Sequence, residues 1–89
     1  KQFFLLDEKH NARKNFTLTY KGFLFEGEKY LRDGEDTESV NSILISAVSP
    51  ADAESLTQAD LFYIEEQVKQ HYPEAEVEWE EPLQTLPVQ

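Results

Sequence analysis

Hydrophobic and polar residues alternate between Phe16 and Phe25 in a pattern that predicts a β-hairpin. If Lys21-Gly22 forms a two-residue turn, Tyr20 pairs with Phe23 and the two arms share an apolar face. The apolar side chains of that face are then Phe16, Leu18, Tyr20, Phe23 and Phe25. The opposite face carries Thr17, Thr19 and Glu26, with Leu24 as an apolar exception. Glu26-Gly27 is an alternative turn that the sequence leaves open.

Three further segments are predicted to be strands. Residues 2–6 contain four consecutive apolar residues and are followed by a charged run, which indicates a short strand. Residues 40–48 carry apolar side chains at both parities, which favours an interior strand covered at least in part on both sides. Residues 74–81 alternate strictly, with Ala75, Val77 and Trp79 on one side and Glu76, Glu78 and Glu80 on the other. The last strand is therefore expected to be half buried, with an acidic outer row.

One main helix is predicted from Asp60 to Tyr72, where the following proline ends it. Its apolar stripe, at steps of three and four residues, is Leu61, Ile64, Val68 and Tyr72. Two helix-start signals precede the stripe, Ser49-Pro50-Ala51-Asp52 and Thr57-Gln58-Ala59-Asp60. They indicate either a short turn followed by the main helix or one bent helix. The residues off the stripe, expected to face water, are Glu65, Glu66, Lys69 and Gln70.

This order of elements predicts an α+β domain with a four- to five-stranded, mostly antiparallel sheet and one main helix packed on one face. A chain of 89 residues supports one hydrophobic core, so residues 1–81 are expected to form a single domain. Residues 82–89 contain two prolines and no periodic pattern, and we expect an extended C-terminal tail.

The net charge and its distribution along the chain argue for some classes of function and against others. Eighteen acidic and eight basic residues give a net charge of −10, which argues against direct nucleic-acid binding. The charge is uneven, because residues 1–32 hold seven bases against four acids and residues 33–89 hold one base against fourteen acids. Such polarity steers association or favours head-to-tail self-contact. The simpler interpretation is that the acids keep a small domain soluble.

Catalytic, metal and cofactor sites are not indicated. The chain has no cysteine, and its three glycines form no phosphate-binding loop. His10 and His71 lie in no known catalytic spacing, and a histidine is favourable at a helix C-terminus by charge alone. The acidic segment 33–38 lacks the ligand spacing of a calcium loop. We therefore predict a non-catalytic protein without a metal or cofactor.

Membrane contact is not indicated either. The longest apolar run, residues 3–6, is far shorter than the roughly 20 residues of a membrane-spanning helix. It is also too short for the apolar segment of a signal peptide. We expect a cytoplasmic domain.

The leading hypothesis for function is a small acidic protein-binding domain, an adaptor or inhibitor, that uses an acidic face against a basic protein partner. The candidate partner-binding residues are Glu76, Glu78, Glu80, Glu65, Glu66 and Asp60. These residues combine the acidic row of the last strand with acids of the predicted helix.

Two other hypotheses remain open. The first is a nucleic-acid mimic that competes for a DNA- or RNA-binding protein. Glutamates on one strand face are roughly 6.7 Å apart, whereas duplex DNA carries one charge per ~1.7 Å, so a single row is about fourfold too sparse. The second is a small homo-oligomeric enzyme or ligand-binding domain, because an aromatic content of 12% can leave apolar surface for a homodimer.

Overall fold

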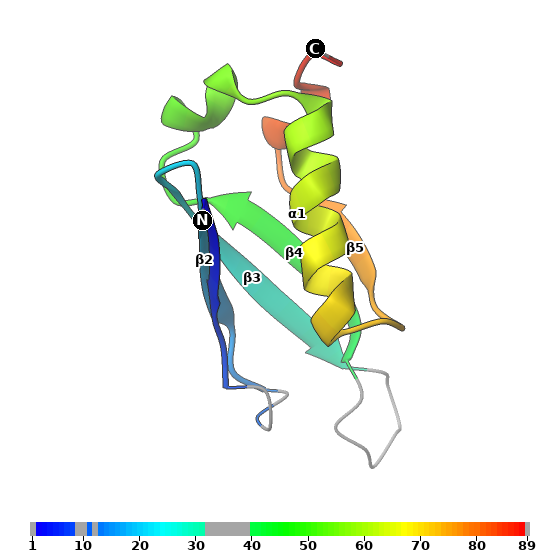
Figure 1. Ribbon diagram of the computed structural model, residues 1–89. Coiled ribbons are helices and arrows are strands. Elements are labelled where there is room, and N and C mark those ends of the chain that lie inside the picture. The colour runs from blue at the N-terminus through cyan, green and yellow to red at the C-terminus, as the bar shows by residue number, and fades with distance from the viewer. Residues whose placement is uncertain (1, 9–10, 12, 32–39, 89) are drawn as a thin grey trace.

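The computed structural model describes residues 2–8, 11, 13–31 and 40–88 (Figure 1). Five strands form one sheet in the order β1-β2-β3-β4-β5, and the helix α1 lies across one face. The elements are β1 (Phe3–Leu6), β2 (Phe16–Tyr20), β3 (Phe23–Leu31), β4 (Val40–Ala47), the 3-10 helix η1 (Asp52–Ser55), α1 (Gln58–His71), β5 (Glu76–Trp79) and the 3-10 helix η2 (Leu83–Thr85). Neighbouring strands are antiparallel except β4 and β5, which are parallel and are connected through α1. The predicted α+β fold is confirmed.

The β2–β3 hairpin has the predicted turn and register, with Tyr20 paired to Phe23. Lys21 and Gly22 have φ angles of 53° and 85°, the left-handed conformation that a two-residue hairpin turn requires. The alternative turn at Glu26-Gly27 is not formed, because β3 continues through it to Leu31.

The helix α1 begins at the second of the two predicted start signals. The Thr57 side chain accepts a hydrogen bond from the Asp60 N–H, and the Asp60 carboxylate accepts one from the Thr57 N–H. This reciprocal capping box satisfies two backbone donors that a helix start otherwise leaves unpaired. The first start signal gives the separate helix η1, so the short turn followed by a main helix is the correct alternative.

The hydrophobic core lies between α1 and the sheet face that it covers. Its fully buried large side chains include Phe16, Leu18, Phe25, Ile43, Ile45, Ile64 and Val68. The strand β4 is interior, as predicted, since β3 and β5 flank it. Trp79 points into this core, where its ring meets that of Phe25 edge to face.

Residues 82–88 are not the extended tail that the two prolines suggest. Leu83 begins η2, and both Leu83 and Leu86 are buried in the core. Gln58 holds the segment to the start of α1, because its N–H donates to the Pro87 carbonyl and its side chain donates to the Leu86 carbonyl. Residues three apart lie on one side of a 3-10 turn, so the spacing of the two leucines was the available signal.

Candidate functional site

The sheet face that α1 leaves uncovered carries glutamates from two strands. Glu78 of β5 pairs with Leu44 of β4, and Glu28 of β3 pairs with Leu44 from the other side. Residues paired across neighbouring strands point to the same face, so these three side chains form one row across the sheet. Strand alternation puts this row opposite the buried Ile43 and Ile45.

Two lines of glutamates therefore flank β4 on the uncovered face. We call them the acidic rows, and all five members are exposed: Glu26 and Glu28 on β3, and Glu76, Glu78 and Glu80 along β5. Neighbouring strands lie about 4.8 Å apart, so two strand spacings separate the rows by roughly 10 Å. The floor between them is formed by the β4 side chains Ser42, Leu44 and Ser46.

The pKa of Tyr30, which lies on the same face, is raised by glutamates of both acidic rows. A hydrogen bond with Glu28 is the main cause of its raised pKa. Burial and the charge of Glu28 raise that pKa further, as do the charges of Glu80 and Glu78 on the far side of β4. The negative field of the two rows thus overlaps above β4.

Asp60, one of the predicted contact residues, belongs to the helix start and not to this face. Its carboxylate accepts hydrogen bonds from the Tyr20 hydroxyl at 2.7 Å and from Lys21 Nζ at 3.1 Å. Burial would raise the pKa of Asp60, but the hydrogen bonds from Tyr20, the Thr57 N–H and Lys21 lower it to about 2. Only 14% of the Asp60 side chain is exposed. Its negative charge is used in these contacts within the domain.

Glu65 and Glu66, the other two predicted contact residues on the helix, differ in their exposure. Glu65 is half buried and accepts a hydrogen bond from Trp79 Nε1 at 3.2 Å, whereas the sequence pattern predicts a solvated side chain. Glu66 is exposed on α1. The structure therefore separates the predicted set, because the three β5 glutamates lie on the face opposite the helix.

An exposed apolar row lies on the same uncovered face, nearer to β1. Phe4 pairs with Thr19, Thr19 pairs with Leu24, and the Val48 N–H donates to the Leu24 carbonyl. The apolar row consists of Phe4, Leu24 and Val48, which are 64%, 45% and 55% exposed. The uncovered face therefore combines an acidic part with an apolar part.

A buried ion pair, which the sequence analysis missed, lies beneath α1. Lys29 Nζ is 2.9 Å from Asp7 Oδ1, and the side chains are 0% and 6% exposed. The Tyr72 hydroxyl donates to the other Asp7 oxygen, and Lys29 Nζ donates to the Asn11 carbonyl. Burial lowers the pKa of Lys29, but hydrogen bonds with Tyr72 and Asp7 outweigh it and leave the pKa raised. Continuing the inward parity of β3 from Phe25 would have placed Lys29 inside.

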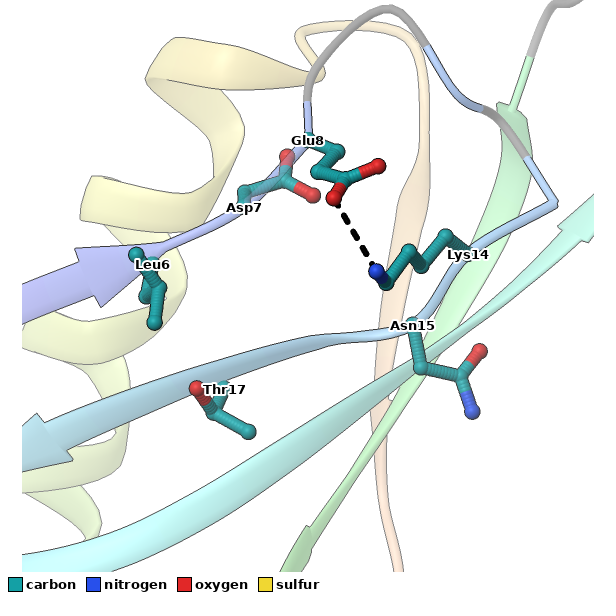
Figure 2. Close-up of a pocket in the computed structure, with 6 residues that line it drawn as sticks. All are labelled: Leu6, Asp7, Glu8, Lys14, Asn15 and Thr17. Carbon is teal, nitrogen blue, oxygen red and sulfur yellow. Dashed lines mark hydrogen bonds and ion pairs between the residues drawn. The ribbon is translucent and has the colours of Figure 1, made fainter.

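A pocket of about 300 Å³ opens beside Asp7 (Figure 2). Its lining consists of Leu6, Asp7, Glu8, Lys14, Asn15 and Thr17. Glu8 and Lys14 form an exposed ion pair at 3.0 Å, so the charged side chains of the lining are already paired. Across the described residues, no three His, Asp or Glu side chains are grouped to hold a metal ion. His71 is exposed, whereas His10 and the segment 33–38 lie outside the described residues.

These features define a small α+β domain in which one helix covers a five-stranded sheet and leaves an acidic and apolar face open. Residues 1–89 match the family described as "Sigma-w pathway protein YsdB", and the chain belongs to this family. That description names no enzymatic activity.

A curated relative of the same description, from Bacillus subtilis (strain 168), is 38% identical to this chain over 81 residues. The aligned part covers 91% of this chain and 62% of the relative, so the chain spans less than two thirds of the relative's length. No solved structure matches the chain. Within the described residues, no helix is long and apolar enough to cross a membrane.

Proposed function

We propose that this domain is a non-catalytic protein-binding domain, an adaptor or inhibitor, whose acidic rows receive a basic protein surface. The observation that carries the proposal is the position of five exposed glutamates on the sheet face without a helix. The ion pairs among the described residues use Asp7, Glu8 and Asp60 and leave the acidic rows out. The charge of these rows is thus available to a partner.

The dimensions of the face support a basic segment as the contact. The roughly 10 Å between the rows is close to the 10–12 Å diameter of an α-helix with its side chains. A basic helix that lies along β4 can therefore direct lysines or arginines to both rows. The small and apolar side chains of β4 form a floor that a helix can approach, and the apolar row offers contact area beyond it.

The family gives this proposal its setting. The Bacillus subtilis relative is named as a sigma-w pathway protein, and we propose that this chain acts in a corresponding pathway, in the cytoplasm. The match covers 62% of that relative, so the proposal is limited to this domain and does not extend to the rest of the relative.

The test neutralises the β5 row and follows association with a basic partner recovered from the host lysate. The variant Glu76→Gln/Glu78→Gln/Glu80→Gln changes the net charge from −10 to −7 at nearly constant side-chain size. We expect slower association and a flatter dependence on salt, because surface charge mainly governs the rate of encounter.

A matched control removes the same charge from the helical side of the domain. Asp52→Asn/Glu54→Gln/Glu66→Gln also gives −7, and all three positions are exposed. It is expected to associate at nearly the native rate. If both triple variants associate equally at every ionic strength, the acidic rows are not the site.

Nucleic-acid mimicry is the second candidate, and the β3 row is the observation that favours it. Two rows give one charge per about 3.4 Å along the strands, which reduces the deficit against duplex DNA from fourfold to about twofold. A mimic displaces duplex DNA or RNA from the recovered partner, and the β5-row variant loses that ability. A partner that binds no nucleic acid leaves the adaptor or inhibitor as the function.

A further inference from the structure

The strand β1 forms one margin of the sheet and lacks the features that protect an edge strand. It pairs with β2 alone in the described sheet (Figure 1). Residues 3–6 contain no charged residue, proline or glycine, which are the usual means of preventing edge-to-edge pairing. The strand at the other margin, β5, carries two glutamates among its four residues.

The backbone groups at this edge follow from the pairing of β1 with β2. The Lys21 N–H donates to the Gln2 carbonyl, so the even-numbered residues of β1 direct their backbone groups to β2. The N–H and C=O groups of Phe3 and Leu5 therefore point to the outer edge. They can form a ladder with another strand.

The side chains of β1 offer apolar surface beside that edge. Phe4 and Leu6 are 64% and 65% exposed on the uncovered face of the sheet. Phe3 and Leu5 are half buried on the other face and pack against the core. A strand added to β1 would cover apolar side chains on both of its faces, and exposed apolar patches of this kind mark interfaces.

We propose that β1 pairs antiparallel with β1 of a second copy, around a two-fold axis that joins the two five-stranded sheets into one. The edge is self-complementary, because three apolar residues of one copy can face three apolar residues of the other. Among the hydrogen-bonded registers that the outward groups of Phe3 and Leu5 allow, two bring three apolar residues of each copy opposite one another. One places Phe4 opposite Phe4 of the other copy, and the other places Leu5 opposite Leu5.

For a contact between two copies, charge favours the β1 edge over the β5 edge. Two chains of −10 repel one another wherever their acidic rows meet. A contact at β1 separates the two β3 strands by five strand spacings, about 24 Å, which exceeds the screening length of about 8 Å at physiological salt. A contact at β5 would instead place Glu76 and Glu78 of both copies within that length. The dimer leaves the acidic rows open, so it is independent of the proposed function.

Light scattering of the native chain over a concentration series tests the dimer. We expect the mass to rise from 10.4 kDa to twice that value and then to remain constant. Phe4→Lys places a charge at or beside the two-fold axis in either register and is expected to weaken the dimer at least about tenfold. Val48→Lys is the matched control on the same sheet face, and it should dimerise as the native chain does. Melting curves of both variants check the fold.

Disulfide trapping tests the register, because the chain contains no cysteine of its own. In the first register Phe4→Cys places two thiols opposite one another, within the range of a disulfide. In the second register Phe4 faces Leu6 of the other copy, so Phe4→Cys alone is not cross-linked and the double variant Phe4→Cys/Leu6→Cys is. A covalent dimer of Phe4→Cys under oxidising conditions indicates the first register, and a covalent dimer of the double variant alone indicates the second. Val48→Cys should still dimerise through β1 but form no disulfide.

Three results would overturn the proposal. The first is a native chain that stays monomeric at about 0.1 mM, which would leave the β1 edge to a strand of another protein. The second is a dimer that Phe4→Lys does not weaken. The third is a mass that grows without limit, because head-to-tail pairing of β1 with β5 forms an open filament.

Discussion

Lys29 is a cation that the fold removes from water. Its side chain is 0% exposed, and its Nζ lies beside Asp7, the Asn11 carbonyl and the face of the Tyr72 ring. Removing a charge from water costs several kcal/mol, which only a close counter-charge and further hydrogen bonds offset. The structure of this corner of the domain therefore depends on Lys29 and Asp7 together.

Removing one partner of this ion pair should cost more than removing both charges. In Lys29→Met the Asp7 carboxylate stays buried without its cation, and we expect a loss of about 3–5 kcal/mol in the free energy of unfolding. The double variant Asp7→Asn/Lys29→Met keeps an acceptor for the Tyr72 hydroxyl and should recover much of that loss. Urea unfolding measures all three chains. A double variant no more stable than Lys29→Met would contradict this account.

Asp60 should make the stability of the domain depend on pH in the acid range. Its pKa is lowered from 3.8 to about 2 in the folded chain, so its ionised form stabilises the fold above pH 3.8. That contribution is lost as the pH falls from about 4 to about 2. Asp60→Asn should be less stable at pH 7 and show a flatter decline over the acid range in urea titrations. Parallel declines for the two proteins would exclude this role.

At the scale of elements, two glycines support the β2–β3 hairpin for different reasons. Gly22 has a φ of 85° with open space around its Cα, so its conformation disfavours most other residues while its surroundings would admit a side chain. Gly27 lies against the Phe16 ring, which a Cβ at this position would overlap. Backbone conformation restricts the first position and packing restricts the second.

Substitutions at the two glycines should separate these causes. Gly22→Val should cost more than about 1 kcal/mol, whereas Gly22→Asn should cost less, because asparagine tolerates the left-handed conformation. Gly27→Ala should cost about 1–3 kcal/mol by displacing the Phe16 ring, and Gly27→Asn should give no relief. Thermal and denaturant unfolding measure each loss. Relief by asparagine at position 27, or none at position 22, would contradict the assignment.

The elements that sequence patterns predicted correctly are those fixed by neighbours along the chain. The Lys21-Gly22 turn sets the hairpin register, and the Thr57 to Asp60 capping box starts α1. The acidic rows depend instead on strand order, which places β3 two strands from β5 and brings Glu28 into line with Glu78. Strand order is a property of the whole fold, and alternation within a single strand does not contain it.

The same distinction explains the helix acids and the ion pair. Glu65 was assigned to a solvated face because it lies off the helical stripe, and Asp60 was taken as a partner contact. Tyr20 and Trp79, which pair with them, are 40 and 14 residues away along the chain. Lys29 meets Asp7 across a comparable separation. Contacts of this range follow from packing, which local periodicity does not encode.

At the scale of the whole molecule, the acidic rows should make the domain more stable as salt increases. Like charges repel across and along the rows, and the screening length falls from about 30 Å at 0.01 M salt to about 3 Å at 1 M. We expect the melting temperature to rise with sodium chloride, and to rise less for Glu76→Gln/Glu78→Gln/Glu80→Gln. Calorimetry over a salt series measures both slopes. Equal slopes would show that charge repulsion from the β5 row does not lower the stability of the fold.

The burial of Leu83 and Leu86 determines when this domain can complete its fold during synthesis. The first four strands emerge before the covering helix, so their apolar face has no cover while the ribosome adds the rest of the chain. At 5–20 residues per second, the interval from Ala47 to Leu86 is roughly two to eight seconds. Throughout it the nascent sheet exposes the surface that chaperones bind. The last leucines therefore mark the end of that exposure as well as the closure of the core.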